Sequence, residues 1–148
     1  MKKKTCKAVG AIVKNRKGHY LVLYRLRFPQ GLGCPAGHVE KDETREEALV
    51  RELFEETGLR AKKIVCVLRS LLTANSKCKR GISRHKWQVF RVLNYSGRPK
   101  RREKREHAFV KFMSPKKIRE YAAKNDLTPA WIEIFRRLKI INGRKHKP

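Results

Sequence analysis

Residues 37–59 read GHVEKDETREEALVRELFEETGL, and this stretch decides the fold and the site expected for the chain. Thr44 and Glu47 have the spacing of a capping box, which satisfies free amide groups at the start of a helix. Strong helix formers follow through Phe54, and Gly58 is placed to end the helix as a left-handed C-cap. The stretch therefore predicts a helix that begins after Thr44 and ends at Gly58.

Three carboxylates share one face of this predicted helix. At 100° per residue, Glu52, Glu55 and Glu56 fall within an arc of about 100°. The opposite arc is expected to pack against a sheet, and it consists of Leu49, Val50, Leu53 and Phe54.

The acidic face is unfavourable for the helix. Like charges three or four residues apart each cost about 0.2–0.5 kcal/mol, and acids near the C-terminal end oppose the helix dipole. The residues four positions after Glu52 and Glu55 are Glu56 and Leu59, so no base relieves the repulsion at that spacing. A merely solvated acidic face is the usual alternative. The unrelieved repulsion favours a bound Mg²⁺ or Mn²⁺ instead, since both prefer oxygen ligands and activate water for attack on phosphorus.

The same stretch resembles the Nudix box. That motif has a glycine, a glutamate, an Arg-Glu pair, an aliphatic residue, two glutamates, a glycine and a final aliphatic residue at fixed intervals. The matching residues are Gly37, Glu43, Arg51, Glu52, Leu53, Glu55, Glu56, Gly58 and Leu59. The resemblance implies a Nudix-type hydrolase that uses Mg²⁺ or Mn²⁺ to cut a diphosphate linkage in a nucleoside diphosphate derivative.

The resemblance also implies roles for individual residues. The metal ligands would be Glu52, Glu55, Glu56 and the backbone carbonyl of Ala36, whereas Arg51 and Glu43 would orient the helix and its glutamates. Family members often recruit a further acid downstream of the box as a ligand or general base. Glu106 is slightly favoured over Glu103 for this role, and the alternative is that both acids only offset the bases around them.

The remaining pattern predicts one domain of mixed α/β (α+β) class over residues 1–148, and the resemblance implies a Nudix-like mixed β-sheet between helices. Two apolar runs separated by a turn suggest a hairpin, and breaker-rich residues 28–36 read as a loop. The expected strands are residues 7–13, 19–24, 64–68, 87–93 and 108–112. Ser114-Pro115 and Thr128-Pro129 predict helices over residues 115–123 and 129–138.

The charge of the chain suggests a polyanionic partner. Lys and Arg number 39 against 13 Asp and Glu, so the formal net charge is +26, yet residues 37–59 hold eight of the acids. Bases concentrate at residues 2–4, 77–84, 98–105 and 144–147. Each run alone reads most simply as a solvated segment, but together they fit possible RNA binding. A generally basic proteome would produce the same surface. An RNA- or ribosome-binding protein that uses a Nudix fold with little catalysis is therefore the alternative to the enzyme.

The sequence narrows the substrate only in part. Two signals typical of Nudix branches are missing: a proline about 15 residues after the box, for ADP-ribose hydrolases, and a tyrosine there, for dinucleoside-polyphosphate hydrolases. Nucleoside triphosphates, modified nucleotides and capped or triphosphorylated RNA ends remain the better candidates. Phe28 and Trp87 could stack on a base, although aromatic residues at such positions more often belong to the core. Arg25 is a further candidate for substrate contact.

The cysteines, histidines and localisation give weaker signals. Cys6, Cys34, Cys66 and Cys78 form no C-x-x-C pair and have no histidine at zinc-finger spacing, so reduced thiols are expected. His85 and His107 receive no role. No segment has the length and apolarity of a membrane span or an export signal, so a cytoplasmic protein without a membrane partner is expected. The oligomeric state stays open.

Overall fold

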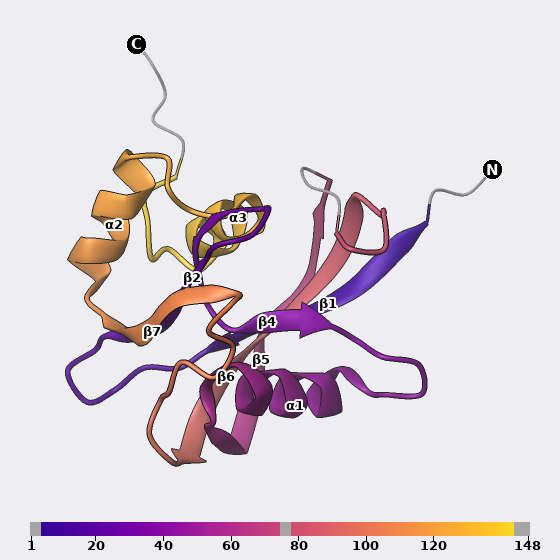
Figure 1. Cartoon of the computed structure of the whole chain (residues 1–148), viewed down its shortest axis with the longest axis horizontal. Coiled ribbons are helices and arrows are strands. Elements are labelled where there is room, and N and C mark those ends of the chain that lie inside the picture. Colours follow the sequence, from indigo (N-terminus) through magenta and orange to yellow (C-terminus); the bar gives the residue numbers. More distant parts are fainter. Residues whose placement is uncertain (1–3, 75–77, 144–148) are drawn as a thin grey trace.

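The structure is a computed structural model that describes residues 4–74 and 78–143. Strands and helices follow one another in an irregular order along the chain (Figure 1). They are β1 (Thr5–Ile12), β2 (Tyr20–Arg25), β3 (Gly31–Gly33), β4 (Ala36–His38), α1 (Arg45–Thr57), β5 (Arg60–Thr73), β6 (Arg84–Ser96), β7 (His107–Met113), α2 (Pro115–Ala123) and α3 (Pro129–Arg137).

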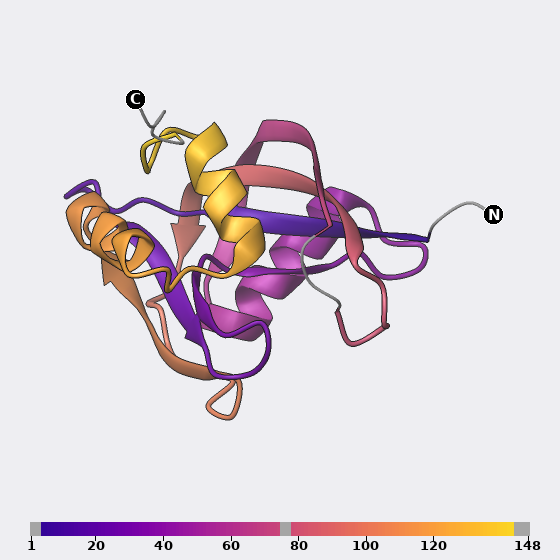
Figure 2. The same cartoon turned by 90° about the horizontal axis from the view of Figure 1, so that it is seen from above.

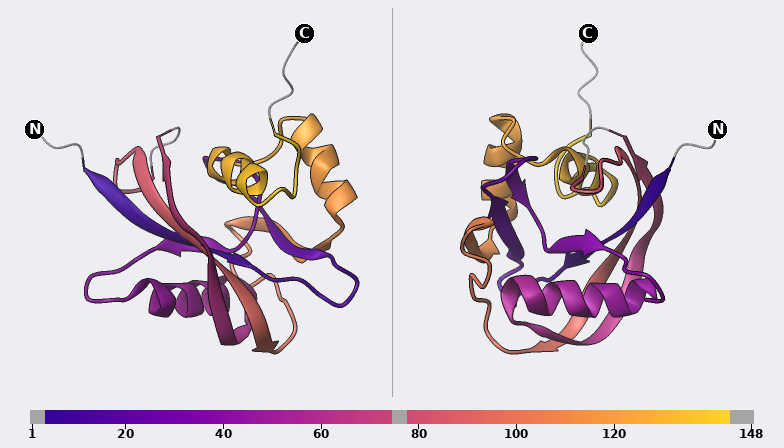
Figure 3. Two further views of the ribbon diagram at one scale, coloured as in Figure 1. Left: turned by 180° about the vertical axis from the view of Figure 1, so that it is seen from behind. Right: turned by 45° about the vertical axis from the view of Figure 1, so that its right-hand side comes forward.

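The strands form two sheets. The larger has the order β4-β1-β6-β5, in which β1 and β6 are parallel and the other neighbours antiparallel. The smaller is antiparallel, with the order β3-β2-β7. Helix α1 lies along one side of the molecule, and α2 and α3 lie on the other (Figures 1 and 3). The expected mixed α+β class with strands between helices is confirmed, although the strands divide into two sheets.

Strand β1 contributes side chains to both hydrophobic cores, because its side chains alternate between the two faces of the sheet. Val9 and Ala11 pack into the core that contains Leu53 of α1. Ala8 and Ile12 belong to the other core, which is closed by Ile118 of α2 and by Trp131, Ile134 and Phe135 of α3. Figure 2 shows β1 running between α1 and α3. One central strand therefore fixes both layers of helices.

The expected hairpin between the first two strands forms only next to its turn. The turn itself forms, since the amide of Asn15 donates to the carbonyl of His19 over 3.0 Å. Beyond the single bridge between Lys14 and Tyr20, however, β1 and β2 enter different sheets. The expected loop over residues 28–36 contains β3 and the start of β4. These strands are three residues long and rich in glycine, so they carry no hydrophobic alternation that sequence reasoning can detect.

The predicted starts of the helices are confirmed. The Thr44 hydroxyl accepts from the amide of Glu47, the Glu47 carboxylate accepts from the amide of Thr44, and Gly58 ends α1 at φ 80°. At the start of α2 the Ser114 hydroxyl accepts from the amide of Lys117, and Pro129 begins α3 directly after Thr128. Thr128 caps α3 with its backbone only, since its hydroxyl makes no capping hydrogen bond.

The predicted apolar face of α1 is only half right. Leu49 and Leu53 are buried, but Val50 is 39% exposed. Phe54 is half-buried, and its ring lies 4.3 and 4.5 Å from the guanidinium carbons of Arg60 and Arg102. The buried arc of α1 is rotated toward the carboxylates. As a result Glu56, which was assigned to the acidic face, is only 6% exposed.

Strands β5 and β6 extend well beyond the expected residues 64–68 and 87–93. They pair with each other along their length, and several register shifts interrupt the ladder. Within residues 4–74 and 78–143, no helix has the length and apolarity needed to cross a membrane. Lys2, Lys3 and the basic end at residues 144–147 lie outside the described residues, as does Lys77 in the basic run before β6.

Candidate active site

Two of the box glutamates lie at the base of a cleft of about 330 Å³. Glu56 faces the start of β4, where its Oε1 accepts a hydrogen bond of 2.7 Å from the amide of Ala36. Glu52 lies one turn earlier on α1 and lines the same cleft. The strand that holds Ala36 pairs with β1 through Gly10 and Ala36. The helix is thereby fixed with its carboxylates against the edge of the larger sheet.

Gly37 allows this close approach. A Cβ atom on Gly37 would overlap the carboxylate carbon and both oxygens of Glu52. Because no side chain intervenes, the Glu52 carboxylate can lie directly against the backbone of β4. Glycine at the first position of the motif is therefore required by the space that Glu52 occupies.

Arg51 connects the carboxylates that flank the cleft. Its Nε and Nη2 donate to the two carboxylate oxygens of Glu43 over 2.8 and 3.0 Å, and Nη2 also donates to the carbonyl of His38 over 3.0 Å. Its Nη1 donates to Glu52 over 2.9 Å and to Glu55 over 3.3 Å. The sequence analysis treated the repulsion among the glutamates as unrelieved, and this is wrong in part. A base four residues before Glu55 offsets some of it.

The pKa of the Glu52 carboxyl is raised to about 7, mainly by burial and then by the neighbouring Glu56 carboxylate, although Arg51 opposes the shift. Burial likewise raises the pKa of Glu56, against the influence of His107 and the Ala36 amide. By contrast, the hydrogen bonds from Arg51 hold the pKa of the Glu43 carboxyl below its usual range. A hard cation among these buried oxygens would stabilise their charged forms, so the donors present fit Mg²⁺ or Mn²⁺.

His107 is a site residue that the sequence analysis missed. Its side chain is buried at the start of β7, and its Nε2 lies 3.4 Å from Oε2 of Glu56. Glu103 joins these two residues, because one ligand atom from each lies within 4.8 Å of the others. No local signal could have found this contact, since 51 positions of chain separate Glu56 and His107.

The two downstream acids are placed differently. Glu103 and Glu106 both line the cleft, but Glu103 lies in the cluster with Glu56 and His107. Glu106 forms an ion pair of 3.5 Å with Arg27 instead. Glu55 points elsewhere: its side chain is half-exposed and pairs with Arg51, and it is absent from the described residues that line the cleft.

The three candidate substrate-binding residues also differ from one another. Phe28 lines the cleft with 75% of its surface exposed, as a ring available for stacking requires. Arg25 lines it too, but its guanidinium donates to the carbonyls of Pro29 and Phe28 and so shapes the loop before β3. Trp87 also lines the cleft but is only 8% exposed: its indole N–H donates to Thr73 and its ring packs on Trp131 in the core, which matches the alternative interpretation.

Comparison with known proteins agrees with this geometry. The family model of the NUDIX domain matches residues 4–133. The chain is 38% identical over 78 residues to an RNA pyrophosphohydrolase of Actinobacillus succinogenes, which is 52% of this chain and 39% of that relative. It is 42% identical over 58 residues to an NAD-capped RNA hydrolase of Schizosaccharomyces pombe, across 38% of this chain and 15% of that protein. The matched segments thus span well under half of these relatives.

Solved structures share the fold over nearly the whole chain. A MutT Nudix hydrolase from Burkholderia pseudomallei matches with a TM-score of 0.69 and 22% identity, over 93% of this chain and 97% of that one. A MutT protein from Methanosarcina mazei Go1 matches with a TM-score of 0.70 and 24% identity, over 94% and 96%. Because the family model covers most of the sequence, the chain belongs to the Nudix family.

Proposed function

We propose that this protein is a metal-dependent pyrophosphohydrolase that cuts a diphosphate linkage at the 5′ end of RNA or in a free nucleotide. The observation that carries the proposal is the pair of carboxylates of Glu52, which is half-buried, and Glu56, which is buried, in a cleft whose edge is basic. Acids with raised pKa values in a cleft are typical of functional sites, because their burial costs free energy that the hydrogen bonds from Arg51 and Ala36 only partly offset.

The metal would be Mg²⁺ or Mn²⁺, held by Glu52, Glu56 and the carbonyl of Ala36, with Glu55 as a more exposed ligand. When bound, such an ion neutralises phosphate charge and lowers the pKa of a coordinated water. Arg51 keeps Glu52 in place through its two bonds to Glu43. His107, whose Nε2 lies 3.4 Å from Oε2 of Glu56, holds that carboxylate in place.

A further acid is needed to accept the proton of the attacking water. We propose Glu103 for this role, because it lies within 4.8 Å of both Glu56 and His107. Glu106, the acid favoured from the sequence, would instead hold the strand end through its pair with Arg27. The two assignments are separated by the variants described in the Discussion.

The basic edge of the cleft supports an RNA substrate. Arg25, Lys79 and Arg80 line the cleft with the carboxylates, and exposed Phe28 offers a ring to the first base. Two of the relatives named above act on RNA according to their names, one as an RNA pyrophosphohydrolase and the other as an NAD-capped RNA hydrolase. A cytoplasmic location is part of the same proposal, because RNA 5′ ends and free nucleotides are found there. We also propose that all 148 residues form one domain.

The experiment is a substrate panel with and without Mg²⁺ or Mn²⁺. 5′-Triphosphorylated RNA, NAD-capped RNA and nucleoside triphosphates are incubated with the full chain, and the released diphosphate, phosphate or nucleotide is measured. Glu56→Gln should reduce turnover by about 10²-fold or more. Glu120→Gln is the matched control, because Glu120 is an exposed acid on α2 that pairs only with Lys117 among the described residues.

The rival function is an RNA- or ribosome-binding protein without catalysis. It would give no product from any substrate, and RNA binding that Glu56→Gln leaves unchanged or strengthens. Binding to RNA through the basic edge should weaken steeply as salt rises, whereas a flat salt response would argue against phosphate contacts in either function.

A further inference from the structure

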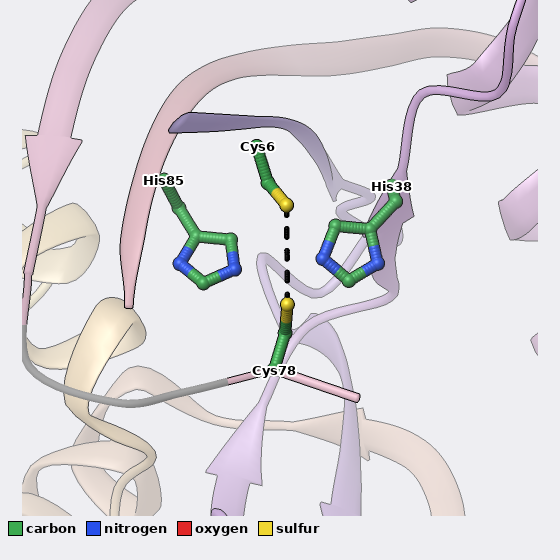
Figure 4. Close-up of side chains that lie close together, drawn as sticks. All are labelled: Cys6, His38, Cys78 and His85. Carbon is green, nitrogen blue, oxygen red and sulfur yellow. Dashed lines mark hydrogen bonds between the residues drawn. The ribbon is translucent and has the colours of Figure 1, made fainter. Parts of the chain in front are cut away.

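We propose that the chain holds one structural Zn²⁺, at a site separate from the carboxylates, on the side chains of Cys6, His38, Cys78 and His85. Figure 4 shows the two sulfur atoms facing each other, with an imidazole on either side. Reduced thiols without a metal site were expected from the sequence, because the cysteines form no C-x-x-C pair and have no histidine at zinc-finger spacing. All four cysteines are free, but the fold brings Cys6 and His38 together with Cys78 and His85.

The distances suit a single tetrahedral ion. One ligand atom from each side chain lies within 4.8 Å of the other three. The sulfur atoms of Cys6 and Cys78 are 3.9 Å apart. Two thiolates bound at about 2.3 Å to one tetrahedral Zn²⁺ are about 3.8 Å apart, so the sulfur pair already has the required separation. The rings of His38 and His85 are 5.5 Å apart, and each turns a nitrogen toward the space between the sulfurs (Figure 4).

The register of the sheet preorganises three of the ligands. Cys6 of β1 pairs with His85 of β6, and Ala8, two residues further along β1, pairs with His38 of β4. Residues two apart on a strand share a face, and paired residues on neighbouring strands point to the same side. The three side chains are therefore held together by backbone hydrogen bonds, whether or not a metal is bound.

The fourth ligand comes from a tight turn before β6. The amide of Cys78 donates to the carbonyl of Ile82 over 3.0 Å, and the amide of Gly81 donates back to Cys78 over 2.9 Å. Gly81 has φ 74°, which suits this turn because glycine adopts positive φ without strain. The turn fixes the backbone of Cys78 with its thiol directed at Cys6.

The chemistry of the donors selects zinc over the metal of the catalytic cleft. Two thiolates and two imidazoles form a closed tetrahedral set of the kind found in structural zinc sites, whereas Mg²⁺ prefers oxygen. Cys6 is 4% and His85 8% exposed, so a bound ion would be largely shielded from water. Cys34 and Cys66 take no part, since the thiol of Cys34 is buried in the core and Cys66 is half-buried on β5.

The position of the site suggests what the ion does. Cys78, His38 and His85 line the edge of the catalytic cleft, and Arg80 beside Cys78 forms an ion pair of 3.6 Å with Glu40. A zinc ion there would join the β5–β6 connection to β1 and to the segment that leads into α1. It would thereby fix the basic residues that face the substrate.

The test is metal analysis of the full chain, purified under reducing conditions without chelator. We expect about one zinc per chain. Cys78→Ser should retain less than about one tenth of this content, and because Cys78 lies in a turn, the variant should still fold. His85→Asn is the second variant. Cys66→Ser and His19→Asn are matched controls outside the cluster, and Glu56→Gln should keep its zinc because its carboxylate belongs to the other site.

Cobalt gives a readout that is independent of activity. Co²⁺ taken up by the metal-free chain should show the strong visible absorption of a tetrahedral site and a thiolate charge-transfer band, and Cys78→Ser should lose both. Removal of zinc should lower the melting temperature by about 4 °C or more. Absence of zinc and of the cobalt spectrum in the reduced protein would overturn the proposal, as would bound iron or a disulfide between Cys6 and Cys78.

One consequence rests on the proposed function. Loss of zinc should raise KM for an RNA substrate severalfold while kcat changes less, because the basic residues would be displaced and the carboxylates would not. If no substrate is cleaved, the zinc content and cobalt spectrum still decide whether the metal site exists. The two proposals can therefore fail separately.

Discussion

Replacing Gly37 by alanine would test the close contact on which the carboxylate site depends. The added Cβ would overlap the carboxylate of Glu52. Gly37 is not among the described glycines with positive φ, so alanine can adopt its backbone conformation. Contacts of a Cβ ordinarily begin at 3.4 Å. The Glu52 carboxylate would therefore have to retreat by about 1 Å, a misplacement that typically costs about 10²-fold in rate.

The assay measures both metal affinity and turnover. Gly37→Ala should lower kcat/KM by about 10²-fold, which corresponds to about 3 kcal/mol of transition-state stabilisation, and should weaken Mn²⁺ binding measured by calorimetry. Gly143→Ala is the matched control, because a Cβ at Gly143 meets no atom within 4 Å. It should leave both quantities unchanged.

A double-mutant cycle identifies the cause. In a Glu52→Ala background the carboxylate is gone, so adding Gly37→Ala should change Mn²⁺ affinity by less than about 0.5 kcal/mol. If the glycine substitution weakens Mn²⁺ binding equally in both backgrounds, the contact with Glu52 is not its mechanism. Full activity in the single variant would also refute the reasoning.

Three further predictions concern the same site. Arg51→Lys keeps the charge but loses the two-pronged bond to Glu43, so kcat should fall about tenfold or more in a steady-state assay, and an unchanged kcat would remove the orienting role. Glu103→Gln should lower kcat by about 10²-fold or more and Glu106→Gln by less than about tenfold, and the reverse order would return the general base to Glu106. In the folded metal-free protein the pKa of Glu52 is raised to about 7. Between pH 4.5 and 7 the folded state therefore binds more protons than the unfolded chain, and the stability contributed by protonated Glu52 is lost as pH rises through 7. Denaturant unfolding in EDTA should show about 2 kcal/mol more loss from pH 5.5 to 8 in the wild type than in Glu52→Gln, and equal slopes would contradict the shift.

Helix α1 could be predicted from the sequence because its signals are local. The capping box of Thr44 and Glu47 and the C-cap at Gly58 act within one or two turns of backbone, so the residues themselves fix the start and end of α1. The spacing of Glu52 and Glu56 likewise fixes their positions on the helix. Which arc of the helix is buried was less certain, since packing against β4 and β1 made Glu56 inaccessible and left Val50 exposed.

The sheet pairing could be predicted only in part. Strands with continuous apolar runs, such as β1 and β2, were found, but their partners depend on hydrogen bonds between distant segments. The parallel pairing of β1 with β6 joins residues 79 positions apart, as in Cys6 and His85. The short strands β3 and β4 form because β2 and β1 pair with them through backbone hydrogen bonds. Their own residues show no hydrophobic alternation that sequence reasoning could detect.

The sequence by itself determined the family, the helix and the identity of the glutamates, because a motif of fixed spacing on one helix needs no other part of the chain to be read. Only the tertiary structure decided that His107 and Glu103 meet Glu56, and that two cysteines and two histidines from four segments converge beside the cleft. The physical reason is the distance along the sequence over which each kind of contact is determined. Helix geometry relates residues three or four apart, whereas contacts between strands are set by sheet register, which no single segment encodes.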